Sequence, residues 1–331
     1  MKRKTISSNK PIHITKRDKT LLETIREYGL VSTEHVRHLL FPSFSRARKR
    51  LRQLWQHGLL VRLDRPTKIG EGTKMKLYRI SRKGERLLTS DDKKAANVNR
   101  ARPVSSSYAE HLLAINRFRV CMNLAARKTD GVSLSDWMSD RQSVLRVSVQ
   151  NGRGQLRMTL VPDGAFSLLA DRLVYRYFLE VDRGSVSISR MRMKLLGYHD
   201  LYVNSRCRHD QTRVGFRVLI VTDTERRLKR IVETIQGFST NFRRPDVFLL
   251  ADSMNFSYYA PERVLGPIWT VVSADRKVAH SQPLIPSIRS SRQCQVNHQC
   301  TGMNPAHGNG HSCSADKVKP ILPGAGAETT R

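Results

Sequence analysis

The chain has 331 residues, of which 39% are hydrophobic, enough for about two globular domains with ordinary cores. Its 59 Lys and Arg residues against 28 Asp and Glu residues give a formal net charge of +31, which is typical of a protein that binds a polyanion, with nucleic acid as the first candidate. An acidic membrane surface is the other candidate, but no segment approaches the ~18 apolar residues of a membrane-spanning helix. The basic N-terminus lacks the apolar run of a signal peptide, and five cysteines, an odd number, do not indicate a disulfide framework, so we expect a reduced cytoplasmic protein.

Residues 13–88, which follow a basic lead at 1–12, predict three helices and then two strands. The first helix begins after Thr15, an expected N-cap with Asp18 in the position of a capping acid, and ends at Gly29. After the third helix, LLVRLDR and KLYRI are typical of strands, with a polar segment between them and the short helix SRKGERLL behind them. This is the element order of a winged helix-turn-helix domain.

The third predicted helix, SFSRARKRLRQLWQHG, separates an apolar face from a basic face. In a DNA major groove, arginine suits guanine edges and phosphates, and glutamine suits adenine. The expected DNA-contacting residues are Arg46, Lys49, Arg50 and Gln53, with Lys74 from the segment between the two strands. A solvated basic face, or a winged helix that binds protein, is the alternative.

Beyond a polar linker at 89–107, residues 108–272 predict a second domain. A long helix from about Tyr108 to Arg127 is followed by strand-like segments and then by alternating helices and strands. This order predicts an α/β fold with a mixed sheet. Residues 273–331 are rich in polar residues, and we expect them to form a disordered tail.

Two acidic segments of the second domain, VPDGAF and YFLEVDRG, form the main candidate site. They lie on the two arms of a predicted β-hairpin, and a turn centred between Asp171 and Arg172 places Asp163 opposite Glu180. Opposed residues lie about 5 Å apart on one face, and Asp182 shares that face through the period of two. Three converging carboxylates would suit Mg²⁺ or Mn²⁺, which could activate water and neutralise a scissile phosphate. Ordinary strand-end acids and a Pro-Asp-Gly turn are the alternative.

The predicted tail repeats one spacing of metal-binding residue types. Its candidate zinc ligands are Cys294, His298, Cys300, His307, His311 and Cys313. The spacings match no common zinc-finger pattern and no core surrounds them, so an unstructured extension with incidental ligands is the favoured interpretation.

The order of these motifs resembles the replication-relaxation family of plasmid and mobile-element proteins. The matching segments are TKRDKTLLETIREYGLVSTEHVRHLLF, EHLLAIN, VPDGAF, YFLEVDRG, MKLLGYHDLY and PIWT. The chain is also similar in plan to mobilisation relaxases whose catalytic domain has a restriction-endonuclease-like fold. The resemblance implies a winged helix for DNA and a domain of the PD-(D/E)xK class.

The family motif maps its acidic positions onto Asp163 and Glu180, but its lysine position is occupied by Asp182. Lys194, on the following helix, could supply the amine instead, as lysines do in some members of this class, with a solvated surface lysine as the alternative. Altered nickase chemistry, or a domain that binds DNA without cutting it, would also account for the missing lysine. Arg183 is a weaker substitute because a guanidinium cannot act as a base. Glu110, beside His111, matches the place where some of these enzymes carry a further metal-binding acid, and a packing role is again the alternative.

Two functions follow from these features. The first is a protein that binds double-stranded DNA at an origin region, together with relaxosome or replication proteins, and nicks one strand in a metal-dependent reaction. The second is a non-catalytic accessory or regulatory DNA-binding protein with a degenerate nuclease domain.

Overall fold

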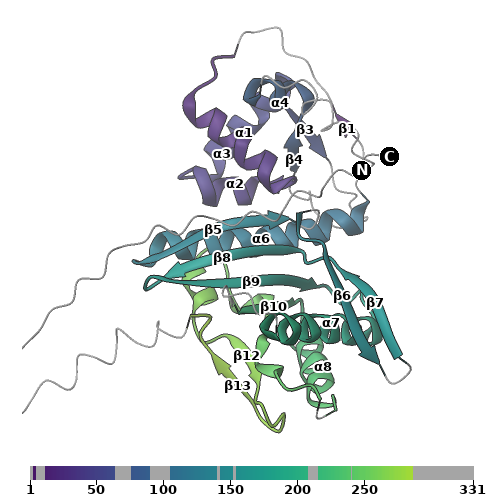
Figure 1. The fold of residues 1–331 in the computed structure, drawn as a ribbon. Coiled ribbons are helices and arrows are strands. Elements are labelled where there is room, and N and C mark those ends of the chain that lie inside the picture. The colour runs from purple at the N-terminus through teal and green to yellow at the C-terminus, as the bar shows by residue number, and fades with distance from the viewer. Residues whose placement is uncertain are drawn as a thin grey trace, which may run out of the picture. The chain divides into compact units, whose positions relative to one another are not determined.

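The computed structural model describes residues 3–4, 12–63, 76–89, 105–139, 142–151, 154–207, 215–239 and 241–285. The described residues combine helices with a seven-stranded mixed sheet, which confirms the predicted α/β class. Figure 1 shows the arrangement of the elements. No helix among the described residues is long and apolar enough to cross a membrane.

The N-terminal region contains the predicted three helices followed by two antiparallel strands. Its helices are α1 (Lys16–Tyr28), α2 (Thr33–Leu40) and α3 (Phe44–Gln56), with α4 (Arg82–Leu88) after the strands. Its small sheet has the order β1 (Arg3–Lys4), β3 (Leu60–Leu63), β4 (Leu77–Ile80) and β2 (Val31–Ser32). Thr15 caps α1 in a capping box with Asp18, as predicted.

Helix α6 (Ser106–Lys128) packs against both the N-terminal elements and the main sheet. Val120 is buried with the core of α1, α2 and α3, whereas Phe118 and Met122 are buried with the sheet residues. The buried Asn116 donates hydrogen bonds to the carbonyl oxygens of Tyr28, at 2.9 Å, and Leu30, at 2.6 Å. These amide bonds fix the end of α1 on α6.

The main sheet has the order β13-β12-β11-β10-β9-β8-β5. Strands β9 (Leu173–Asp182), β10 (Phe216–Thr222) and β11 (Phe248–Asp252) are parallel to one another. The other strands pair antiparallel and are β5 (Val132–Ser139), β8 (Gly164–Ala170), β12 (Trp269–Val272) and β13 (Ala279–Gln282). Helix α6 covers one face, and α7 (Ile188–Cys207) and α8 (Glu225–Gln236) cover the other (Figure 1).

Side chains of β9 therefore alternate between two helical layers. Leu179 and Val181 pack in the core formed with α6, whereas Phe178 packs with α7. Because successive side chains point to opposite faces, Glu180 lies on the α7 face with Phe178.

Two predicted strands do not join the main sheet. Strands β6 (Leu145–Asn151) and β7 (Gly154–Leu160) pair only with each other among the described residues, and they pack on α7. The described residues also include the short 3-10 helices η2 (Pro245–Val247), η3 (Ser253–Asn255) and η4 (Pro261–Leu265).

The α/β region extends past the predicted end at residue 272. Strand β13 pairs with β12, and the side chains of Leu284 and Ile285 are fully buried in the core against α6 and the sheet. Because these two apolar residues follow a polar hairpin, the apolar pattern of the sequence seemed to end before them. The six Cys and His residues between 294 and 313 lie outside the described residues.

Candidate functional site

The β8–β9 hairpin has the predicted register. Gly164 lies opposite Leu179, and the turn residues Asp171 and Arg172 both have positive φ, at 49° and 63°. Two left-handed residues are what a two-residue hairpin turn requires. Asp163, directly before β8, is thereby placed beside Glu180 at the end of the hairpin.

Asp163 is held by backbone and by α6. Its amide donates to the carbonyl of Leu179 at 2.9 Å, and its Oδ2 accepts the amide hydrogen of Val181 at 2.7 Å. The Oδ1 atom of Asp163 lies 2.9 Å from Nε2 of His111. The hydrogen bond to Asp163 raises the pKa of His111, whereas burial lowers it. The net pKa is raised, which favours the imidazolium form.

Glu180 is buried, with 3% of its surface exposed, and both carboxylate oxygens have partners. Nζ of Lys194 lies 2.5 Å from Oε2, and the hydroxyl of Tyr198 donates to Oε1 at 2.6 Å. Both partners come from α7, four residues apart, and thus from one face of that helix. Burial raises the pKa of Glu180 to about 7, although the charge of Lys194 lowers it.

Asp182 lines the same pocket as Asp163 and Glu180, as the prediction of three converging acids requires, but its carboxylate is bound to partners of its own. Its Oδ2 lies 2.7 Å from Nε of Arg227 on α8, and its Oδ1 accepts the amide hydrogen of Gly184 at 2.8 Å. Asp182 lies two residues beyond Glu180, about 6.6 Å further along β9. At this position the side chain contacts α8, whereas the side chain of Glu180 contacts α7. Among the described residues, no group of three or more His, Cys, Asp and Glu side chains is arranged to hold a metal ion.

The carboxylates open into a pocket of about 580 Å³. Its walls include Asp163, Glu180, His111, Lys194 and Arg183. Arg183 is also ion-paired with Asp223, at 3.4 Å. Glu110 is not among the lining residues, so the member of α6 that reaches Asp163 is the neighbouring histidine.

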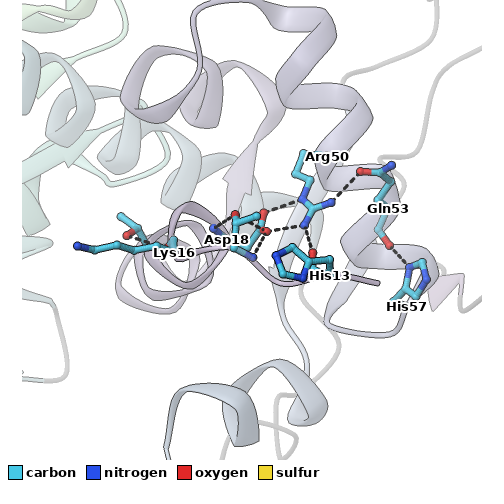
Figure 2. A network of polar contacts seen from close by, with 8 residues as sticks. His13, Lys16, Asp18, Arg50, Gln53 and His57 are labelled. Atoms are coloured by element: carbon cyan, nitrogen blue, oxygen red, sulfur yellow. Dashed lines mark hydrogen bonds and ion pairs between the residues drawn. The ribbon is translucent and has the colours of Figure 1, made fainter. Parts of the chain in front are cut away.

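Arg50, on the basic face of α3, is part of a network of polar contacts with Asp18, Gln53 and His13 (Figure 2). Nε of Arg50 lies 2.6 Å from Oδ1 of Asp18, and its Nη2 is bonded to Oδ2 of the same carboxylate. The guanidinium also donates to Oε1 of Gln53, at 3.0 Å, and to the carbonyl of His13, at 2.8 Å (Figure 2). Most of the guanidinium donors of Arg50 thus have intramolecular partners, and the DNA contacts of Arg50 and Gln53 stay predictions that these bonds would compete with.

Exposed cations remain on α3. The predicted Arg46 and Lys49 are exposed, and so are Arg48 and Arg52, which the helical pattern did not single out. The predicted Lys74 lies outside the described residues. Four exposed cations on one helix still form a basic surface.

The family model for replication-relaxation matches residues 22–217, more than half of the chain. The chain belongs to the replication-relaxation family. The match includes α3, Asp163, Glu180 and Lys194 of this replication-relaxation protein, and it ends at the start of β10. No curated protein and no solved structure matches the chain.

The carboxylates of the pocket are of the ligand type that a hard divalent cation prefers. Mg²⁺ is commonly held by one or two carboxylates together with waters and substrate phosphates. Asp163 and Glu180 line the same pocket and provide two such groups. Two nearby groups, the Lys194 ammonium and the His111 imidazolium, would balance the charge of a carboxylate pair before an ion binds.

Two residues of this site were missed by sequence reasoning. Tyr198 was assigned to the core, and its ring is indeed buried, but its hydroxyl holds Glu180. Its spacing of four from Lys194 is the signal that could have paired the two residues on one helical face. Arg227 carried no signal, because its partner lies 45 residues away in sequence.

The raised pKa of Glu180 predicts how the stability of the protein depends on pH. The folded state holds a proton on this carboxyl up to about pH 7, whereas the unfolded chain loses it near pH 4.5. The burial of Glu180 should therefore lower the free energy of unfolding progressively as the pH rises through this window. We expect Glu180→Gln, in the absence of divalent ions, to gain stability relative to wild type between pH 5 and 7, as urea unfolding will measure. A stability difference that does not change with pH would contradict this assignment.

Proposed function

We propose that this replication-relaxation protein binds double-stranded DNA at an origin of a plasmid or other mobile element and nicks one strand there. Family membership indicates the role in replication or mobilisation. The net charge of +31 supports DNA as the partner. Origin recognition would also bring the protein together with relaxosome or replication proteins.

The contact between Lys194 and Glu180 carries the nuclease part of the proposal. The chain has Asp182 where the nuclease motif has its lysine, so an amine must come from elsewhere. Nζ of Lys194 lies 2.5 Å from the Glu180 carboxylate and lines the same pocket as Asp163. The two acids and the amine of that motif are thereby brought together from three elements.

Asp163 and Glu180 would hold a Mg²⁺ or Mn²⁺ ion in this pocket. Such an ion, when bound, supplies an activated water and neutralises charge on a scissile phosphate. Lys194 orients the Glu180 carboxylate and offers a cation to a nearby phosphate. Tyr198 fixes the other oxygen of the same carboxylate, so that its position does not depend on the amine alone.

The exposed cations of α3 would bind the DNA. Arg46 and Lys49 are exposed on the third helix, which is the groove-binding element of a helix-turn-helix. Arg50 would hold this helix in place by its bonds to Asp18 near the start of α1.

A nicking assay on supercoiled plasmid that carries the native origin tests the proposal. We expect open circles with Mg²⁺ or Mn²⁺, none with chelator, and none with Asp163→Asn. The exposed Asp130→Asn serves as the matched control and should nick like wild type. Activity that survives Asp163→Asn would refute the assigned site.

A second function, a non-catalytic DNA-binding accessory or regulatory protein, is favoured by one observation. Asp182, at the lysine position of the motif, is buried and ion-paired with Arg227, as in a site that has acquired a structural role. Intact origin binding without nicking by wild type in either metal would establish this function instead.

A further inference from the structure

The ribbon formed by β6 and β7 has two chemically different faces. Its inner face packs Val147, Val149 and Leu160 against α7, in the same cluster as Leu195 and Tyr198. Its register places Arg146 opposite Thr159 and Arg157 opposite Ser148, with both arginines on the outer face. Arg146, Gln155, Arg157 and Thr159 are all exposed.

The charge of the ribbon has one sign. Residues 141–162 contain four arginines and no aspartate or glutamate. The outward arginines lie diagonally across the two strands, a separation of about 7–8 Å between their backbones. A surface of this kind is complementary to a phosphate backbone.

The ribbon is also fixed to the candidate active site. Strand β7 ends at Leu160, three residues before Asp163, and α7 beneath it carries Lys194. A Cβ at Gly197 would lie 3.1 Å from Leu160 and 3.2 Å from Val147, so α7 and the ribbon are in close contact there. Figure 1 shows the ribbon beside α7 and outside the main sheet.

We propose that the β6–β7 ribbon is a second DNA-binding element, which holds duplex DNA through Arg146 and Arg157 next to the pocket of Asp163 and Glu180. This inference rests on the proposed function and adds a contact surface separate from α3. A two-stranded ribbon fits the major groove of B-DNA, which is about 12 Å wide. The described part of the outer face offers no aromatic ring on which an unpaired base could stack, which favours duplex over single-stranded DNA.

Equilibrium binding of the full chain to a labelled random-sequence duplex, followed by fluorescence anisotropy between about 50 and 200 mM salt, tests the ribbon. We expect Arg146→Ala/Arg157→Ala to weaken binding roughly 10- to 100-fold and to reduce the salt slope by roughly 2. Arg146→Lys/Arg157→Lys should keep most of the affinity, because it keeps the charge. The matched control is Arg226→Ala/Arg230→Ala on α8, which removes two exposed arginines elsewhere and should change the affinity by less than about threefold.

The outcomes separate the ribbon from the wider proposal. A ribbon variant that binds like the α8 control, with wild type bound tightly, would overturn the ribbon and leave DNA binding in place. Wild type without affinity for duplex DNA would overturn both. Thermal unfolding of all variants, with unchanged midpoints expected for these exposed side chains, shows that a loss of affinity is not a loss of fold.

Discussion

Lys194→Ala should reduce metal-dependent nicking by about 10²- to 10³-fold, the usual effect of removing one preorganised charged donor from an active site. The amine lies 2.5 Å from Glu180 and is the only lysine among the residues that line the described pocket. Its removal leaves a carboxylate that is 3% exposed without its cation. Without the nearby positive charge of Lys194, the effect of burial would raise the pKa of Glu180 further, and the carboxyl would hold its proton more strongly.

Single-turnover nicking at saturating protein measures this effect apart from DNA affinity. Lys194→Arg keeps the positive charge but replaces the compact ammonium with a planar fork, and we expect little recovery. Lys229→Ala is the control, since Lys229 is exposed on α8 and pairs only locally with Glu225, at 2.8 Å. A rate for Lys194→Ala within about threefold of wild type would show that the amine is structural and that the chain has no relocated catalytic lysine.

The register of the candidate site was predictable because it depends on local chemistry. A two-residue turn at Asp171 and Arg172 fixes which residues of the two strands lie opposite each other. This register places Asp163 beside Glu180. The same reasoning could not place Asp182. It shares a strand face with Glu180, but its partner is Arg227 on a later helix, and no short-range pattern encodes that pairing.

Long-range packing also decided the parts that the sequence did not reveal. Strands β6 and β7 have ordinary strand patterns, and only their contacts with α7 show that they form a separate ribbon. Leu284 and Ile285 are two apolar residues in a polar context, yet both are fully buried. On α3, helical periodicity identified a polar face. It could not show that the Arg50 side chain is hydrogen-bonded to Asp18, 32 residues earlier.

Asp18→Ala should lower the free energy of unfolding by about 3–5 kcal/mol, the usual cost of removing one partner of a buried ion pair. Only 1% of the Asp18 side chain and 19% of the Arg50 side chain are exposed. The substitution also removes the carboxylate of the α1 capping box, whose Oδ2 accepts from the Thr15 amide at 2.8 Å. Such a loss is a large fraction of the 5–15 kcal/mol that stabilises a typical domain.

The pH dependence of this effect has a definite sign. Burial alone would raise the pKa of Asp18, but the hydrogen bonds from Arg50 and Thr15 hold it below its ordinary value of 3.8. The contribution of the pair is therefore fully present above pH 3.8 and is lost as the pH falls through the lower folded-state pKa. The stability difference between wild type and Asp18→Ala should shrink in strong acid.

Arg50→Ala separates the supporting role of this arginine from a DNA-reading role. We expect it to lower stability like Asp18→Ala, and the double variant to be less destabilised than the sum of the two, because the side chains contact each other. Arg46→Ala/Lys49→Ala should instead weaken duplex binding and flatten its salt dependence with little change in stability, because both side chains are exposed. If Arg50→Ala kept full stability and lost DNA affinity, the Asp18–Arg50 contact would not be the support of α3, and Arg50 would be a DNA-contacting residue.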